Sequence, residues 1–149
     1  MKNLLWLLTL ISLVLNTAAF GKAQPNADVT LDSAEAIFET TTNDKDHDSL
    51  VTITVKHGNT VIAAANNIGG HWNDHSDHNV ALNIGKGWTR DELKSRLKTE
   101  LSFSTNGNDK WEFNYILRLN WSDGTSTEVR YNGQVLTQDD RFRSYAVGL

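Results

Sequence analysis

The segment WEFNYILRLNW, residues 111–121, alternates large apolar residues with polar ones along almost its whole length. Successive side chains of a strand point to opposite faces of a sheet, so this period of two predicts a β-strand with one core face. The predicted core face carries Trp111, Phe113, Tyr115, Leu117, Leu119 and Trp121, and the outer face carries Glu112, Asn114, Arg118 and Asn120. Ile116 departs from the alternation. So many large side chains on one face indicate a core built on a sheet.

Similar patterns lie on both sides of this segment. Residues 51–55 alternate apolar and polar side chains, and Gly58-Asn59 offers a tight turn, which predicts a hairpin over residues 50–65. Residues 122–125 form a second turn sequence, and alternation returns at 127–131. Shorter apolar runs, which bring the total to about eight predicted strands, lie at 36–38, 80–84, 101–103 and 142–147.

One segment has a helical pattern instead. Thr89 and Glu92 have the spacing of a capping box, and leucines recur every four residues after them, at Leu93, Leu97 and Leu101. A short amphipathic helix is therefore predicted over 89–100. Many short strands separated by turns favour two packed sheets, so the predicted fold is mostly β: a single antiparallel β-sandwich of about eight strands with one short helix near residues 89–100.

The N-terminus has the pattern of an export signal. Lys2 precedes an apolar run from Leu4 to Leu15, and small residues follow up to Ala23. A membrane-spanning helix needs about 20 apolar residues, and this run is shorter, so no transmembrane segment is expected in the mature chain. The predicted division is a signal peptide at 1–23, an N-terminal tail at 24–33 and the β-sandwich domain at 34–149. The expected location is secreted or periplasmic.

Composition narrows the classes of partner. Removal of residues 1–23 takes away Lys2 and Lys22 and leaves 12 basic residues against 18 acidic ones. Because phosphate binding requires a basic face, nucleic acid is not expected as a partner. The chain has no cysteine. An exported domain without disulfides is stabilised by packing or by a bound metal.

Three polar loops between predicted strands are rich in oxygen ligands. They lie at 43–48, 71–78 and 106–109. Carboxylates and amides of this kind suit Ca²⁺, which takes six to eight oxygen ligands. The candidate metal ligands are Asp44, Asp46 and Asp48, with Asn108 and Asp109 from the third loop and Asp74 and Asp77 from the second. An EF-hand is not expected, because Ser49 and Val55 stand where that motif requires glycine and glutamate.

Histidine supports an alternative metal. His71, His75 and His78 are close in sequence, and His47 lies in the first loop, so Zn²⁺ is the second candidate ion. The chain has no HExxH motif, no G-x-S-x-G motif and no cysteine nucleophile. A non-enzymatic module is therefore expected. A metal-dependent hydrolase using the Asp and His loop residues, or a structural domain without metal, remains the alternative.

Two tryptophans lie outside the alternating strands. Trp72 is inside the histidine-containing loop, and Trp88 follows Gly85-Lys86-Gly87. Aromatic residues beside polar loops are typical of surfaces that bind a carbohydrate, a lipid headgroup or a protein, and both are candidate ligand-binding residues. The equal alternative is that both pack into the core beneath the loops.

The stretch ETTTNDKDHD, residues 39–48, leads into VTITV at 51–55. This combination resembles the opening of PLAT (lipoxygenase-homology) domains, and the chain is also similar to small uncharacterised bacterial secreted β domains with an Asp-rich loop. The PLAT resemblance covers mainly residues 36–56. It implies an eight-stranded β-sandwich whose loops at one end bind Ca²⁺ and direct the module to membranes or proteins. The predicted helix and the histidine-containing loop depart from that family.

Overall fold

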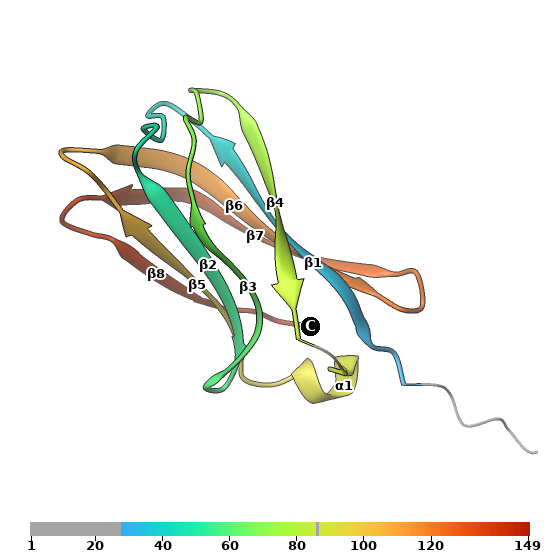
Figure 1. Cartoon of the computed structure of the whole chain (residues 1–149). Coiled ribbons are helices and arrows are strands. Elements are labelled where there is room, and N and C mark those ends of the chain that lie inside the picture. The colour runs from blue at the N-terminus through green and yellow to red at the C-terminus, as the bar shows by residue number, and fades with distance from the viewer. Residues whose placement is uncertain (1–27, 86) are drawn as a thin grey trace, which may run out of the picture.

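The structure is a computed structural model and describes residues 28–85 and 87–149. The predicted signal peptide at 1–23 and the first part of the predicted tail lie outside the described residues. Eight strands and one short helix follow in the order β1 (Leu31–Thr40), β2 (Leu50–His57), β3 (Thr60–Ile68), β4 (Asp77–Ile84), α1 (Arg90–Leu93), β5 (Leu97–Ser104), β6 (Lys110–Trp121), β7 (Ser126–Thr137) and β8 (Phe142–Ala146) (Figure 1). In the described part of the chain, no helix is long and apolar enough to span a membrane.

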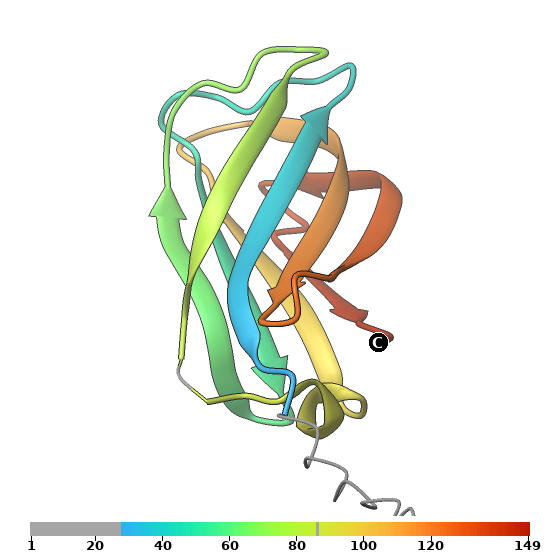
Figure 2. The same cartoon turned by 90° about the vertical axis from the view of Figure 1, so that its right-hand side faces the viewer.

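The strands form one antiparallel sheet in the order β7-β6-β1-β4-β3-β2-β5-β8. The mostly β prediction is confirmed, but the sheet curls into a nearly barrel-shaped form and the predicted sandwich is wrong (Figure 2). The reason is the pairing of β3 with β4, where Ala63 faces Ile84 and Ala64 faces Asn83. This short ladder joins two four-stranded halves that would otherwise be separate layers.

Side chains bridge the two edge strands, β7 and β8. The Tyr131 hydroxyl donates to the Ala146 carbonyl at 2.7 Å, and the Tyr145 hydroxyl donates to Gln134 Oε1 at 2.7 Å. The Arg143 guanidinium donates to the Val135 carbonyl at 2.6 Å. The sheet is therefore closed at this seam by side chains.

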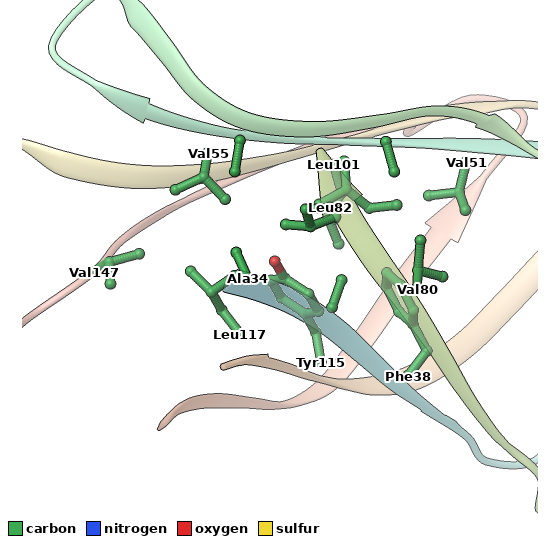
Figure 3. Packing of buried hydrophobic residues seen from close by; sticks show 14 of the residues in the cluster. Ala34, Phe38, Val51, Val55, Val80, Leu82, Leu101, Tyr115, Leu117 and Val147 are labelled. Atoms are coloured by element: carbon green, nitrogen blue, oxygen red, sulfur yellow. The ribbon is translucent and has the colours of Figure 1, made fainter. Parts of the chain in front are cut away.

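Strand β6 has the register that its alternation predicts. All six predicted core residues of 111–121 are buried, and the predicted outer residues are partly exposed. Tyr115 and Leu117 point across the interior toward Val55 and Leu101 on the opposite wall (Figure 3). The exception, Ile116, pairs with Ile37 of β1 on the outer face.

That outer apolar pair is flanked by ion pairs that link β1, β6 and β7, and one of them spans β6 to join β7 to β1. The Arg130 guanidinium donates to both carboxylate oxygens of Glu39, at 2.7 and 2.8 Å. On the other side, Arg118 contacts Glu35 at 2.8 Å and Glu128 at 2.6 Å. The β1–β6 register is regular from Ser33 to Thr40, so Glu35 and Glu39 share a face with Ile37. Aliphatic parts of long charged side chains can cover such a pair, which explains why Ile37 and Ile116 are buried on the outside of the sheet.

The predicted hairpins are confirmed and the predicted helix over 89–100 is largely wrong. The capping box at Thr89 and Glu92 is present, but α1 ends at Leu93. Arg96 has a left-handed backbone (φ 58°), and β5 begins directly after it. Leucines four residues apart fit a helix face, but Leu97 and Leu101 equally share one face of a strand. Pairing with β2 and β8 stabilises the strand there.

The last residues of the segment 24–33, which the sequence predicts as a tail, belong to the sheet. Strand β1 begins at Leu31, which is buried and pairs with Trp121. Thr30 forms a bridge with Thr89, and the Leu31 amide donates to the Trp88 carbonyl at 2.8 Å. The domain therefore starts earlier than the predicted boundary at residue 34, because burial of Leu31 continues the strand toward the N-terminus.

Candidate functional site: the acidic loop end

The polar loops meet at one end of the sheet. Strands alternate in direction, so the β1–β2, β3–β4, β5–β6 and β7–β8 connections share an end, and α1 lies at the opposite end (Figures 1 and 2). We call the end formed by residues 41–49, 69–76, 105–109 and 138–141 the acidic loop end. It contains the first and third predicted loops and most of the second.

Main-chain hydrogen bonds tie the first loop to the second. The Lys45 amide donates to the Trp72 carbonyl at 3.1 Å, and the Trp72 amide donates back to the Lys45 carbonyl at 3.0 Å. The His75 amide donates to the Thr41 carbonyl at 3.1 Å. The two bonds between Lys45 and Trp72 form an isolated bridge between segments that belong to no strand. The two loops are therefore one connected unit.

The centre of this unit is occupied by a lysine. Lys45 is 0% exposed, although lysine is almost never fully buried unless it is paired. Its ammonium donates to the carbonyls of Ser49 at 2.6 Å, Gly70 at 2.6 Å and Asp46 at 3.2 Å. The ammonium also lies 5.0 Å from the centre of the Trp72 ring. An ammonium has three donors, and here all three have an acceptor.

Trp72 belongs to the core. It is 5% exposed, its ring centre lies 5.2 Å from Phe38 and 5.1 Å from Trp111, and it stacks on His78 at 4.7 Å. Trp72 therefore packs into the core beneath the loops, which is the alternative to a ligand-binding position at the surface. Trp88 is partly buried at the opposite end, where it lies edge-on to His57. The two candidate ligand-binding tryptophans are not brought together.

The first and third loops meet at Asp46 and Asp109. The Asp46 amide donates to Asp109 Oδ2 at 3.3 Å, and Asp109 is only 6% exposed. Repulsion from Asp109 is the largest influence on Asp46 and raises the pKa of its carboxyl, with burial, Asp44 and Asp48 acting in the same direction. Two carboxylates that raise a pKa in this way attract a cation.

The other first-loop acids have partners. The side-chain amide of Asn106 donates to Asp48 Oδ2 at 2.9 Å, and this is a second link between the first loop and the third. Asp44 contacts the Nε2 atom of His71 in the second loop. The first loop is therefore the hub of the acidic loop end, since its carboxylates contact both neighbouring loops.

The remaining predicted ligands, Asp74, Asn108 and Asp77, are exposed. Asp77 lies on β4 opposite Glu39. The histidines take separate positions: His75 is exposed with a left-handed backbone (φ 58°), and His78 lies against Trp72. Within residues 28–85 and 87–149, no three His, Asp or Glu side chains converge as a metal-binding group.

No protein-family model, curated protein or solved structure matches this chain. The resemblance to PLAT domains therefore stays a prediction. Sequence reasoning identified the acids of the loop but not the lysine among them. A lysine between two aspartates has the pattern of a solvated surface charge, and only the closure of the loop onto Trp72 shows that it is buried.

Proposed function

We propose that the protein is an exported, non-enzymatic binding module that uses the acidic loop end to recognise an extracellular ligand, and that Ca²⁺ binds at this end. The observation that carries the proposal is the approach of Asp46 to Asp109 from two different loops. Their repulsion raises the pKa of Asp46. A divalent cation beside them relieves this repulsion, so its binding stabilises the folded chain.

The composition of this end favours Ca²⁺ and a ligand rich in oxygen atoms. Asp46 and Asp48 supply carboxylates, Asn106 supplies an amide, and the loop backbone supplies carbonyls, all of which are hard oxygen ligands. A surface-bound Ca²⁺ keeps open positions for a ligand's own oxygens. Carbohydrate hydroxyls, lipid headgroups and acidic protein side chains all have oxygen atoms that can fill these positions. Because Trp72 is buried, the contact would be made through the ion and polar groups.

The test is thermal melting in EDTA, Ca²⁺ and Zn²⁺. A cation that binds only the folded state adds about 2.7 kcal/mol at a hundredfold excess over Kd, a shift of several degrees in the melting temperature. Asp46→Asn should diminish the Ca²⁺ shift and raise the melting temperature in EDTA, because it removes both a ligand charge and the repulsion. Asp139→Asn is the matched control, since Asp139 is exposed at the same end.

Three outcomes would contradict the proposal. An identical Ca²⁺ shift in wild type and Asp46→Asn would place the ion elsewhere. A shift with Zn²⁺ only, abolished by His75→Ala, would assign the metal to the histidine-containing loop and favour the hydrolase alternative. Equal melting in EDTA and Ca²⁺ would favour a binding domain without metal, which the buried Lys45 ammonium supports as the second candidate.

A further inference from the structure

The position of Lys45 is built like a cation site. Three main-chain carbonyls from two loops converge on its ammonium, and an aromatic ring closes the site at 5.0 Å. Carbonyl oxygens directed at one point are the ligands that proteins use for hard cations, and an aromatic face attracts a cation through its quadrupole. The two loops therefore line a cation site, and the cation that occupies it is the chain's own Lys45 ammonium.

The charges around the site match this interpretation. Burial lowers the pKa of Lys45, while Asp109, Asp46 and Asp48 act to raise it. A buried charge is tolerated when it is paired and fully hydrogen-bonded. The three carbonyls satisfy the donors, and the three carboxylates supply the opposite charge without direct contact to the ammonium in the described structure.

We propose that the Lys45 ammonium is the resident cation of the acidic loop end, which holds residues 41–49 against residues 69–76 so that the binding surface is formed before any ligand arrives. Lys45 is thus a positioning residue for the proposed binding function. This inference takes from the proposed function only the assumption that the acidic loop end binds a ligand. The cation site itself does not depend on Ca²⁺, and the two ideas can fail separately.

Residues of similar size or charge could not replace Lys45 at this position. A methionine of similar length fills the space but leaves the carbonyls of Ser49 and Gly70 without a donor in a buried site. An arginine has the charge, but its planar fork does not match three acceptors grouped around one atom. The site is therefore expected to discriminate by charge and by shape.

The decisive experiment is chemical rescue. Lys45→Ala removes the side chain beyond Cβ, and propylammonium has the missing three carbons and the ammonium. We expect Lys45→Ala to lower the melting temperature by about 10 °C, and propylammonium chloride to restore at least half of that loss. 1-Propanol and sodium chloride at equal concentration should restore none of the lost melting temperature. The melting temperature of wild type should change with neither 1-propanol nor sodium chloride. Rescue by 1-propanol as strong as rescue by propylammonium would overturn the proposal, because filling the space would then suffice.

Lys45→Met is the second variant, since it fills the site without charge. We expect its loop amides at 41–49 and 69–76 to exchange at least tenfold faster than in wild type, while β1 and β6 keep their protection. Unchanged loop exchange would show that the ammonium does not hold the loops. If neither variant folds, propylammonium must restore the circular dichroism of Lys45→Ala but not of Lys45→Met, whose site is already filled. Failure to do so would also overturn the proposal. Ca²⁺ titration of wild type tests the proposed function independently.

Discussion

At the scale of single residues, one hydrogen bond in the core joins two buried hydroxyl groups. Thr99 of β5 and Tyr115 of β6 are both fully buried, and their hydroxyl oxygens lie 2.7 Å apart. Burial raises the pKa of Tyr115, so the phenol stays neutral and shares a hydrogen bond with Thr99. Strands β5 and β6 lie on opposite walls of the sheet, so this pair links the two walls at one defined register.

Tyr115→Phe should destabilise the domain by about 1–3 kcal/mol, because it leaves the Thr99 hydroxyl buried without a partner. Thr99→Val should cost a similar amount for the reciprocal reason. The double variant should cost much less than the sum of the two, since both polar groups are then gone. Urea denaturation of all four proteins measures the coupling, and strictly additive losses would show that the hydrogen bond contributes nothing.

Residue chemistry also limits what could be predicted about the site. The acids of the first and third loops were predicted as a group, and the structure does bring Asp46 close to Asp109. Lys45 and Trp72 were not recognised as partners, because 27 positions in sequence separate them and the 69–76 loop must fold back before the ring covers the ammonium. A local sequence pattern identifies the candidate ligands of a loop but not which side chain turns inward.

At the scale of elements, the β2–β3 hairpin offers a comparison between two identical side chains. Val55 of β2 is 0% exposed and Val61 of β3 is 50% exposed. Val55→Ala should cost about 2 kcal/mol from lost burial and the resulting cavity. Val61→Ala should change stability by less than about 0.5 kcal/mol. Thermal melting of the two variants checks this, and equal losses would mean that the hairpin register is wrong.

The contact between β1 and β7 should make stability depend on pH. Hydrogen bonds from Arg130 lower the pKa of Glu39 from its ordinary value of 4.5. A carboxyl with a lowered folded-state pKa adds stability above its unfolded-state pKa, and that stability is lost as pH falls through the folded-state pKa. Glu39→Gln should therefore cost about 1 kcal/mol at pH 7, since the pair is bidentate but partly exposed.

The same variant should show no difference from wild type at a pH below the folded-state pKa of Glu39. Urea denaturation between pH 7 and pH 2 measures the convergence. Asp32→Asn on the same strand is the control, because Asp32 is exposed. A difference between wild type and Glu39→Gln that persists unchanged at pH 2 would assign the loss to packing over Ile37 and Ile116.

Element prediction succeeded where the period was unambiguous and failed where it was not. The eleven residues 111–121 fit only a strand, because large residues occupy odd positions over a length that no helix face explains. Leucines at 93, 97 and 101 fit both a helix and a strand, since a spacing of four is compatible with each period. Hydrogen bonding to β2 and β8 selected the strand for the last two, and no local pattern contains that information.

At the scale of the whole molecule, the difference between a sandwich and a barrel-like sheet depends on very little. The β3–β4 ladder has two residue pairs, and the opposite seam between β7 and β8 is bridged by side chains such as Tyr131 and Arg143. Strand count and alternation are the same in both architectures, so the sequence predicts the strands and their faces. The closure depends on contacts between strands far apart in the chain, which periodicity does not report.

The strand order has a consequence for when the chain can fold. Strand β1 is the first to be synthesised, yet it lies in the middle of the sheet between β4 and β6. Its second neighbour is complete only at Trp121, so the core cannot close until most of the chain has been made. Sheets that depend on such distant pairings fold slowly. A nascent chain whose core cannot close before its later strands are made stays unfolded in the meantime, and such an unfolded chain is what the export that we propose requires.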